Sequence, residues 1–166
     1  MKPMGPIPPW FAAEEGMLLI GGCGAASLVD EAGDTPLFVY DMNIVEAQVR
    51  RFRDAMPPAL HLHYAIKANP YAPLLARMAG LVAGFDVASG GEVDMALDAG
   101  MAPERISFAG PGKRDDELSA ALFAGVTINL ESEGEGARAL RIAEKIGRTP
   151  RLAVREMAQL PLRVTA

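Results

Sequence analysis

Six short segments of the chain alternate apolar with other residues, and longer segments with helical spacing separate them. Alternation at period two is typical of a strand, whereas apolar residues three or four positions apart are typical of a helix. The predicted strands are TPLFVYD (35–41), LHYAIK (62–67), AGFDVAS (83–89), RISFAG (105–110), GVTINL (125–130) and PRLAVR (150–155). The chain therefore alternates strands with helices.

Particular residues mark where these helices begin and end. Ser89-x-x-Glu92 and Ser132-x-x-Glu135 match the capping box, in which a serine oxygen and a glutamate satisfy free N–H groups of the first turn. Glycines suit the left-handed position just past a helix end. Four glycines are predicted to end helices in this way: Gly80, Gly100, Gly125 and Gly147. Repeated strand–helix units predict a parallel sheet, in either a doubly wound domain or a (β/α) barrel.

The two faces of the predicted strands favour the barrel. Helices cover both faces of a doubly wound sheet, so both should be apolar. One face is apolar here, with Phe85, Val87, Ile106, Phe108, Val126, Ile128, Leu130, Leu152 and Val154. The other is small and polar, with Asp86, Ala88, Ser107, Ala109, Thr127, Asn129, Arg151, Ala153 and Arg155. Because buried charges need partners, we expect this face to line the inside of a barrel and to surround something polar.

The predicted fold is therefore α/β, an incomplete (β/α)8 TIM-type barrel of which the chain contains about the first five strands. Residues 61–67, 84–88, 105–109, 126–130 and 151–155 should be parallel neighbours in that order. Lys67, Asp86 and Arg155 should lie at the carboxyl ends of their strands, where such folds place their chemistry.

Composition narrows the function further. Half of the 166 residues are hydrophobic, enough for the core of one domain. The net charge of −5 argues against a nucleic-acid partner. The sequence contains no run of 18 apolar residues, so no membrane span is predicted. Cys23 is the only cysteine, so neither an internal disulfide nor a cysteine metal site is expected. These features predict a cytoplasmic protein.

Lys67 is the residue that most needs an explanation. It closes a strand, and on the same face Ala65 leaves room beside it while Asp86 occupies the next strand. A lysine at a strand end can simply extend to water. A lysine in a site that excludes water can instead lose its proton and attack a carbonyl to form a Schiff base. Both interpretations stay open from the residues alone.

The residues around Lys67 also resemble a known family. YAIKAN (64–69) is similar to the cofactor-lysine motif of the fold-type III pyridoxal-phosphate decarboxylases, which include diaminopimelate, ornithine and arginine decarboxylases. Further similar segments follow in order: TPLFVYD, GFDVASGGE (84–92), ISFAGPGK (106–113), INLES (128–132) and LAVR (152–155). The resemblance covers about residues 17–155. HYAIKANP with FAGPGK most resembles the branch associated with bacterial exosortase and exopolysaccharide gene clusters.

The resemblance implies an alanine racemase-like barrel that binds pyridoxal 5'-phosphate and removes the α-carboxylate of an amino acid as CO2. Lys67 would form the Schiff base, with Ala65 and Asp86 beside the cofactor and Arg155 in the polar network around it. It implies a small amino-acid substrate, a homodimer for the full-length protein and no metal. Two other functions stay open: a non-catalytic binding relative of the same fold, and a racemase or cofactor-carrier barrel that shares the lysine.

Structural roles also stay open for several polar residues. Asp86 can pair with Arg155 or Lys67, and Arg155 can close a salt bridge at a strand end. His61 and His63 are expected to be packed interior residues. Lys113 resembles a lysine in a loop of the family, but a solvated loop charge explains it equally well.

The resemblance also predicts how the chain is organised. Residues 1–30 are expected to form an extension whose MLLIGG strand belongs with a β-domain, and residues 31–155 a partial barrel. The MLLIGG strand should lie loosely or find a substitute edge. Residues 156–166 match nothing in the family. A complete barrel takes about 250 residues, so the chain is expected to be an N-terminal part of such an enzyme and inactive by itself.

Overall fold

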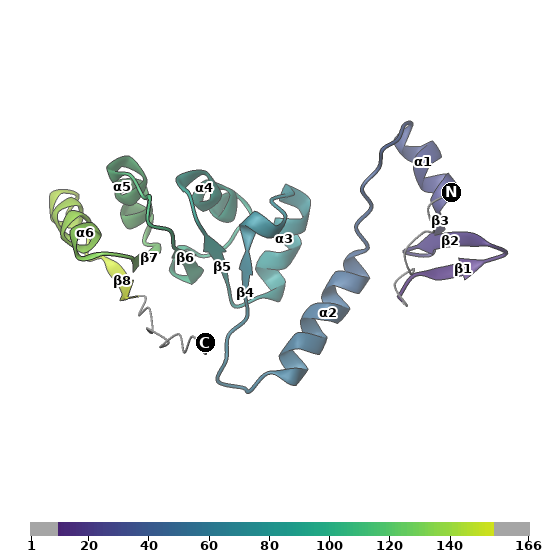
Figure 1. Ribbon diagram of the computed structural model, residues 1–166, viewed down its shortest axis with the longest axis horizontal. Helices are drawn as coiled ribbons and strands as arrows, with labels where there is room; N and C mark the ends of the chain where they lie inside the picture. The colour runs from purple at the N-terminus through teal and green to yellow at the C-terminus, as the bar shows by residue number, and fades with distance from the viewer. Residues whose placement is uncertain (1–9, 155–166) are drawn as a thin grey trace, which may run out of the picture. The chain divides into compact units, whose positions relative to one another are not determined.

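The computed structural model describes residues 10–154, and contacts along the chain divide it into two compact units, residues 1–57 and 58–166. The first unit contains the antiparallel strands β1 (Ala12–Glu14), β2 (Met17–Ile20) and β3 (Cys23–Gly24), followed by α1 (Ala25–Ala32) and α2 (Met42–Ala55) (Figure 1). β2 lies between β1 and β3. Both edges of the predicted MLLIGG strand, which forms β2, are therefore paired with other strands of this unit.

The prediction of a strand over residues 35–41 is wrong. These residues form no strand between α1 and α2, and the Phe38 side chain is 83% exposed. A strand requires a partner for its backbone N–H and C=O groups, and the described residues provide none there. Asp41 instead serves as the N-cap of α2, where its carboxylate accepts the Asn43 N–H at 2.9 Å.

The second unit is built on a five-stranded parallel sheet in the order β4-β5-β6-β7-β8. The strands are β4 (His63–Ala65), β5 (Gly84–Val87), β6 (Ile106–Phe108), β7 (Thr127–Leu130) and β8 (Arg151–Val154). This confirms the predicted order and direction. Each connection crosses over through one helix: α3 (Ala72–Leu81), α4 (Gly90–Asp98), α5 (Asp115–Ala124) or α6 (Glu133–Lys145). Short 3-10 turns, η1 (Ile66–Ala68) and η2 (Pro103–Arg105), follow β4 and precede β6.

The helices α3–α6 lie along one side of the sheet, and the core lies between them and the apolar strand face (Figure 1). Phe85, Phe108 and Ile128 are fully buried. Leu75 on α3 and Leu118 on α5 are buried as well. Burying one such side chain contributes about 1.5–3 kcal/mol. On the opposite face the polar residues of β5–β7 are at intermediate exposure, whereas Arg151 on β8 is exposed.

Three of the four predicted helix-ending glycines are confirmed. Gly100, Gly125 and Gly147 have φ values of 82°, 91° and 65°, the left-handed region that favours glycine. The prediction that Gly80 ends a helix is wrong, because α3 continues to Leu81. The end of that helix is instead closed by the Val82 N–H, which donates to the Met78 carbonyl at 3.0 Å.

Gly84 is required by the close approach of its neighbours. A Cβ atom there would lie 2.2 Å from the Arg105 carbonyl oxygen and 2.7 Å from His63 Cε1. The Arg105 carbonyl cannot retreat easily, because the Arg105 side chain is itself bonded to the Ala83 carbonyl at 2.6 Å. A methyl group at this buried position would therefore push neighbouring strands apart.

We predict that Gly84→Ala destabilises the chain by about 1–3 kcal/mol, the usual cost of overpacking. The matched control is Gly91→Ala in α4, where a Cβ meets no atom within 4 Å. That control should leave stability unchanged or raise it by up to about 1 kcal/mol, because alanine favours a helix. Urea unfolding of the two variants measures the difference. Equal effects of the two substitutions would contradict the packing at Gly84.

Candidate active site

Lys67 lies on the tight turn η1, immediately after β4. Ile66, beside it, is fully buried and anchors the turn in the core, whereas Lys67 is exposed. Two hydrogen bonds close the turn: the Asn69 N–H donates to the Ile66 carbonyl at 3.1 Å, and the Tyr64 hydroxyl donates to the Asn69 carbonyl at 3.2 Å. The YAIKAN residues therefore hold the lysine at the carboxyl end of β4, where it is exposed.

The sheet register places Ala65 beside Asp86, and Asp86 beside Ser107. Asp86 is half-buried on the polar face. Among residues 10–154 the Lys67 ammonium has no carboxylate within 4.0 Å, so the proposed Lys67–Asp86 ion pair is not formed. Arg155, the other proposed partner of Asp86, lies outside the described residues.

Hydrogen bonds cross the polar face between neighbouring strands. Asn129 Nδ2 on β7 donates to Ser107 Oγ on β6 at 2.6 Å. On the other side of β7, Arg151 Nε donates to Thr127 Oγ1 at 3.4 Å. On β6, β7 and β8 the side chains of the polar face therefore hydrogen-bond to one another.

His61 and His63 are exposed, which contradicts their expected place among packed interior residues. They lie on and before the first residue of β4, at the opposite end of the strand from Lys67. The His63 ring lies close to Gly84, since a Cβ added there would come within 2.7 Å of His63 Cε1. The physical reason is that β4 is an edge strand of the described sheet, so its polar face is covered on one side only.

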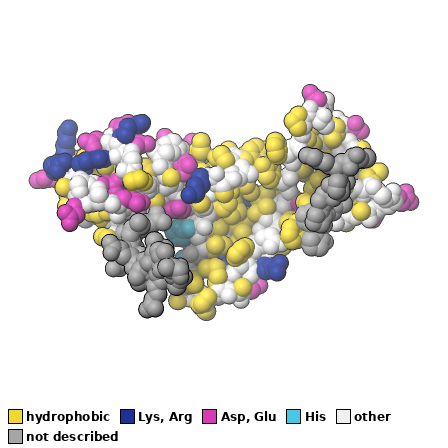
Figure 2. All heavy atoms as spheres, viewed as in Figure 1, with side chains coloured by type: hydrophobic (Ala, Val, Ile, Leu, Met, Phe, Trp, Pro, Cys, Tyr) yellow, Lys and Arg dark blue, Asp and Glu magenta, His cyan; other side chains and the backbone are white. Residues whose placement is uncertain are grey.

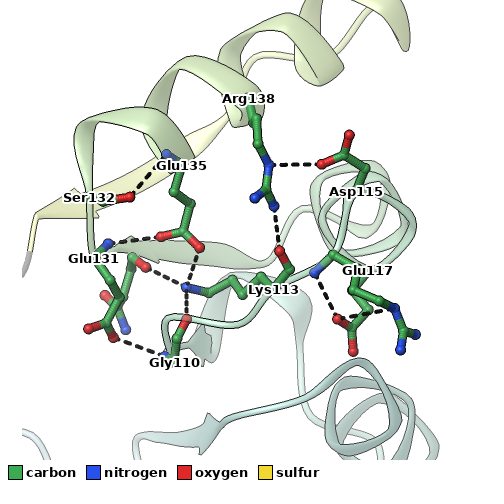
Figure 3. Close-up of polar contacts among 10 residues, drawn as sticks. Gly110, Lys113, Asp115, Glu117, Glu131, Ser132, Glu135 and Arg138 are labelled. Carbon is green, nitrogen blue, oxygen red and sulfur yellow. Dashed lines mark hydrogen bonds and ion pairs between the residues drawn. The ribbon is translucent and has the colours of Figure 1, made fainter.

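Lys113 is buried, so its interpretation as a solvated loop charge is wrong. Its side chain is 1% exposed and its ammonium donates three hydrogen bonds (Figure 3). The acceptors are the carbonyl of Gly110 at 2.7 Å, the carbonyl of Asn129 at 2.8 Å and Glu135 Oε1 at 3.1 Å. Acceptors from three successive segments of the fold replace water completely, which is the condition for burying an ammonium group.

Carboxylates fix the helix starts along the same rim of the sheet. Ser89 and Ser132 cap α4 and α6, as predicted. The glutamate of each pair reaches one residue further than in the usual capping box: Glu92 accepts the N–H of Ala88, and Glu135 accepts that of Glu131, both at 2.8 Å. The sequence pattern predicted the caps but not this longer reach.

Glu117 connects two neighbouring helix starts. Its carboxylate accepts the N–H of Arg114 at 2.9 Å and the N–H of Gly90 at 2.9 Å. These two backbone donors, Arg114 first, hold the pKa of Glu117 below its usual value. A Cβ at Gly90 would lie 2.9 Å from Glu117 Cγ, so the glycine allows this approach.

The outer surface of the helices carries charges of both signs. Figure 2 shows acidic and basic side chains interspersed over α5 and α6. Exposed Arg114 and Asp116 form one such pair at 3.1 Å, which raises the pKa of the arginine and lowers that of the aspartate. Within the described residues no helix is long and apolar enough to cross a membrane, and no cluster of three or more His, Cys, Asp or Glu could hold a metal.

Residues 42–165 match the family model for the pyridoxal-dependent decarboxylases, specifically their pyridoxal binding domain. The chain belongs to this decarboxylase family. A diaminopimelate decarboxylase from Aquifex aeolicus is 40% identical over 149 residues, which are 89% of this chain and 35% of that relative. An L-glutamyl-[BtrI acyl-carrier protein] decarboxylase from Niallia circulans is 39% identical over 125 residues. The chain thus spans about a third of the length of the curated relatives it matches.

Solved structures of decarboxylases share the fold. A structure from Aquifex aeolicus has a TM-score of 0.81 and 38% identity, covering 89% of this chain and 37% of that one. A Helicobacter pylori diaminopimelate decarboxylase, solved with L-lysine, has a TM-score of 0.71 and 31% identity, covering 78% and 33%. These neighbours confirm the predicted partial barrel, and the family implies pyridoxal 5'-phosphate as its cofactor.

The described residues fit the reactive end of that cofactor. An aldehyde needs an accessible amine, and Lys67 offers one that is exposed and has no ion pair with a described carboxylate. Asp86, Ser107 and Asn129 supply polar groups on the polar face of the sheet. Sequence reasoning placed Ser107 and Asn129 on this face but did not single them out, because their hydrogen bond depends on the register of two strands.

We predict that Glu117→Gln lowers the stability of the chain at pH 7 by about 1–2 kcal/mol, since a charged acceptor of two N–H groups is lost. The folded pKa of Glu117 is lowered, so its contribution is complete above the unfolded pKa of about 4.3 and is lost as pH falls through the folded value. Urea unfolding from neutral to acid pH should show the difference shrinking below about pH 4. Glu144→Gln, on the exposed surface of α6, is the control. A difference that does not change with pH would contradict this role.

Proposed function

We propose that this chain supplies the cofactor-binding lysine of a pyridoxal-phosphate-dependent amino-acid decarboxylase. The observation that carries the proposal is the position of Lys67. This exposed lysine lies at the carboxyl end of β4, beside the polar face of a parallel sheet, on a turn that the buried Ile66 anchors in the core. The family match supports the reaction class, because its members decarboxylate amino-acid substrates.

The bound cofactor would serve as the electron sink when the α-carboxylate leaves as CO2. Lys67 would hold the cofactor through its Nζ atom and, once released from it, could carry a proton at that atom. Ala65 would leave room beside the lysine, because its side chain is a single methyl group. Asp86, on the neighbouring strand, would stabilise positive charge near Lys67 or on the cofactor. Arg155, which lies outside the described residues, would join the polar network around the cofactor.

Several finer properties belong to the same proposal. They are a homodimeric full-length protein, a cytoplasmic location, the exosortase-associated branch and the boundaries at residues 30 and 155. The branch rests on the residues HYAIKANP and FAGPGK. The substrate is proposed only as an amino acid, because the relatives include decarboxylases of diaminopimelate and of a carrier-bound glutamyl group.

Two other functions are separated from this one by specific features. A non-catalytic relative would not need to keep the lysine at position 67, which this chain has. A bare cofactor-carrier barrel would not need the β1–β3 unit that precedes the barrel strands. Both features favour the decarboxylase.

We predict that pyridoxal phosphate followed by borohydride attaches to Lys67, identified by mass spectrometry of the peptide containing Tyr64–Lys67. Lys67→Ala should abolish the attachment and leave the fold intact, because it removes an exposed ammonium and no apolar core. Lys67→Arg should also fail, since a guanidinium stays protonated. Lys145→Ala, which removes another exposed lysine, should label normally. Reduced cofactor on Lys113, or none at all, would refute the assignment.

We also predict that the 166-residue chain by itself releases no measurable CO2 from labelled diaminopimelate, ornithine, arginine or lysine. The match covers 35% of the Aquifex relative, so most of that enzyme has no counterpart in the match. A barrel sheet with exposed edges leaves the reacting groups open to water. The control is the Lys67→Ala chain. Release above that control would show that this chain contains a sufficient site.

A further inference from the structure

Lys113 uses every hydrogen of its ammonium group inside the protein. Its three donors meet the Gly110 carbonyl, the Asn129 carbonyl and the Glu135 carboxylate at 2.7, 2.8 and 3.1 Å. The ring of Phe108 lies below it, 5.5 Å from the ammonium to the ring centre. An amine that is fully bonded and 1% exposed cannot act as a nucleophile or bind substrate. The role of this second lysine must therefore be sought in what it holds.

The ammonium connects two neighbouring βα units. Gly110 belongs to the loop between β6 and α5, whereas Asn129 belongs to β7. A second connection between these units runs the other way, because Glu131 Oε1 accepts the Gly110 N–H at 2.9 Å. Gly110 is thus held through both its carbonyl and its N–H group.

The partner of the ammonium is itself fixed. Glu135 Oε2 accepts the Glu131 N–H at 2.8 Å while Oε1 faces Lys113, so both carboxylate oxygens are used. On the other side of the loop, Arg138 donates to the Lys113 carbonyl and forms an ion pair with Asp115 at 2.8 Å (Figure 3). The loop 110–113 therefore has one arrangement that satisfies all of these groups together.

Asn129 connects this buried network to the polar face. Its carbonyl accepts from Lys113, and its side-chain amide donates to Ser107 Oγ at 2.6 Å. Ser107 is in register with Asp86 on β5, the strand next to the one that leads to Lys67. Asn129 thus contacts Lys113 through its main chain and the face where the cofactor is proposed to bind through its side chain.

We propose that Lys113 is a positioning residue of the candidate site, which fixes the main chain of Asn129 and thereby holds the Asn129–Ser107 pair on the cofactor face. The proposal rests on the proposed function for the identity of that face. The residue acts through Asn129 and does not itself touch substrate or cofactor.

The test compares Lys113→Met with the double variant Lys113→Met/Glu135→Met. The single variant leaves a buried carboxylate without its partner and should be strongly destabilised, while the double variant removes that unpaired charge and should recover much of the stability. The double variant therefore supplies a folded chain in which the ammonium is missing. Lys145→Met, which removes an exposed lysine from α6, is the matched control.

The decisive measurement is hydrogen exchange of the Asn129 side-chain amide, followed by NMR. In the double variant this exchange should be about tenfold faster than in the unaltered chain, because the main-chain carbonyl of Asn129 has lost its hydrogen bond from Lys113. Ser107→Ala, which removes the acceptor, gives the upper limit. If stability returns in the double variant and Asn129 still exchanges at the native rate, Lys113 is only structural and the proposal is overturned.

A second measurement addresses the site itself. Borohydride attachment of pyridoxal phosphate to Lys67, at limiting cofactor, should be about five- to tenfold slower in the double variant and unchanged in Lys145→Met. If the double variant attaches the cofactor at the native rate although Asn129 exchanges faster, the proposed effect of Lys113 on the candidate site is overturned. If the unaltered chain never attaches the cofactor, the proposed function fails, while Asn129 exchange still decides whether Lys113 holds that side chain.

Discussion

The carboxyl rim of the parallel sheet depends on one constraint: every helix that starts there has free backbone N–H groups that need acceptors. Glutamates provide many of them. Glu92 accepts an N–H at the start of α4, Glu117 joins the starts of α4 and α5, and Glu135 caps the segment before α6. An anionic acceptor at a helix N-terminus is also favoured by the helix dipole. Glu117 and Glu135 also connect neighbouring βα units, Glu117 through the Gly90 N–H and Glu135 through Lys113, so these caps fix the rim from α4 to α6.

This constraint explains why a lysine can be buried at position 113. A rim made of carboxylates and carbonyls concentrates acceptors, and Lys113 is the cation that uses three of them. Such an arrangement is sensitive to partial loss, since removing one partner of a buried ion pair costs about 3–5 kcal/mol whereas replacing both can be neutral. The net contribution of the pair to stability is therefore small, although breaking it by removing one partner is costly.

The sequence predicted the elements that depend on local pattern. The parallel order of β4–β8, the apolar face with Phe85 and Phe108, and the serine caps all follow from periodicity and short-range chemistry. The failures concern tertiary context. Residues 35–41 have strand-forming side chains but no partner strand among the described residues, and Lys113 looks solvated until three segments surround it. Ser132-x-x-Glu135 predicted a cap, yet nothing local shows that the same glutamate faces a lysine twenty-two residues earlier.

Lys67 and Lys113 show how one residue type can lie in opposite environments on the same rim. Lys113 is surrounded by acceptors in a closed network, so its amine is held as a charged donor and is unavailable for chemistry. Lys67 follows a buried isoleucine on a turn that is closed by Tyr64 and Asn69, and none of those bonds uses its amine. The fold thus fixes the backbone of Lys67 while leaving its side chain accessible. That combination is what a covalent attachment point requires: the amine must reach its partner, and the chain behind it must not move.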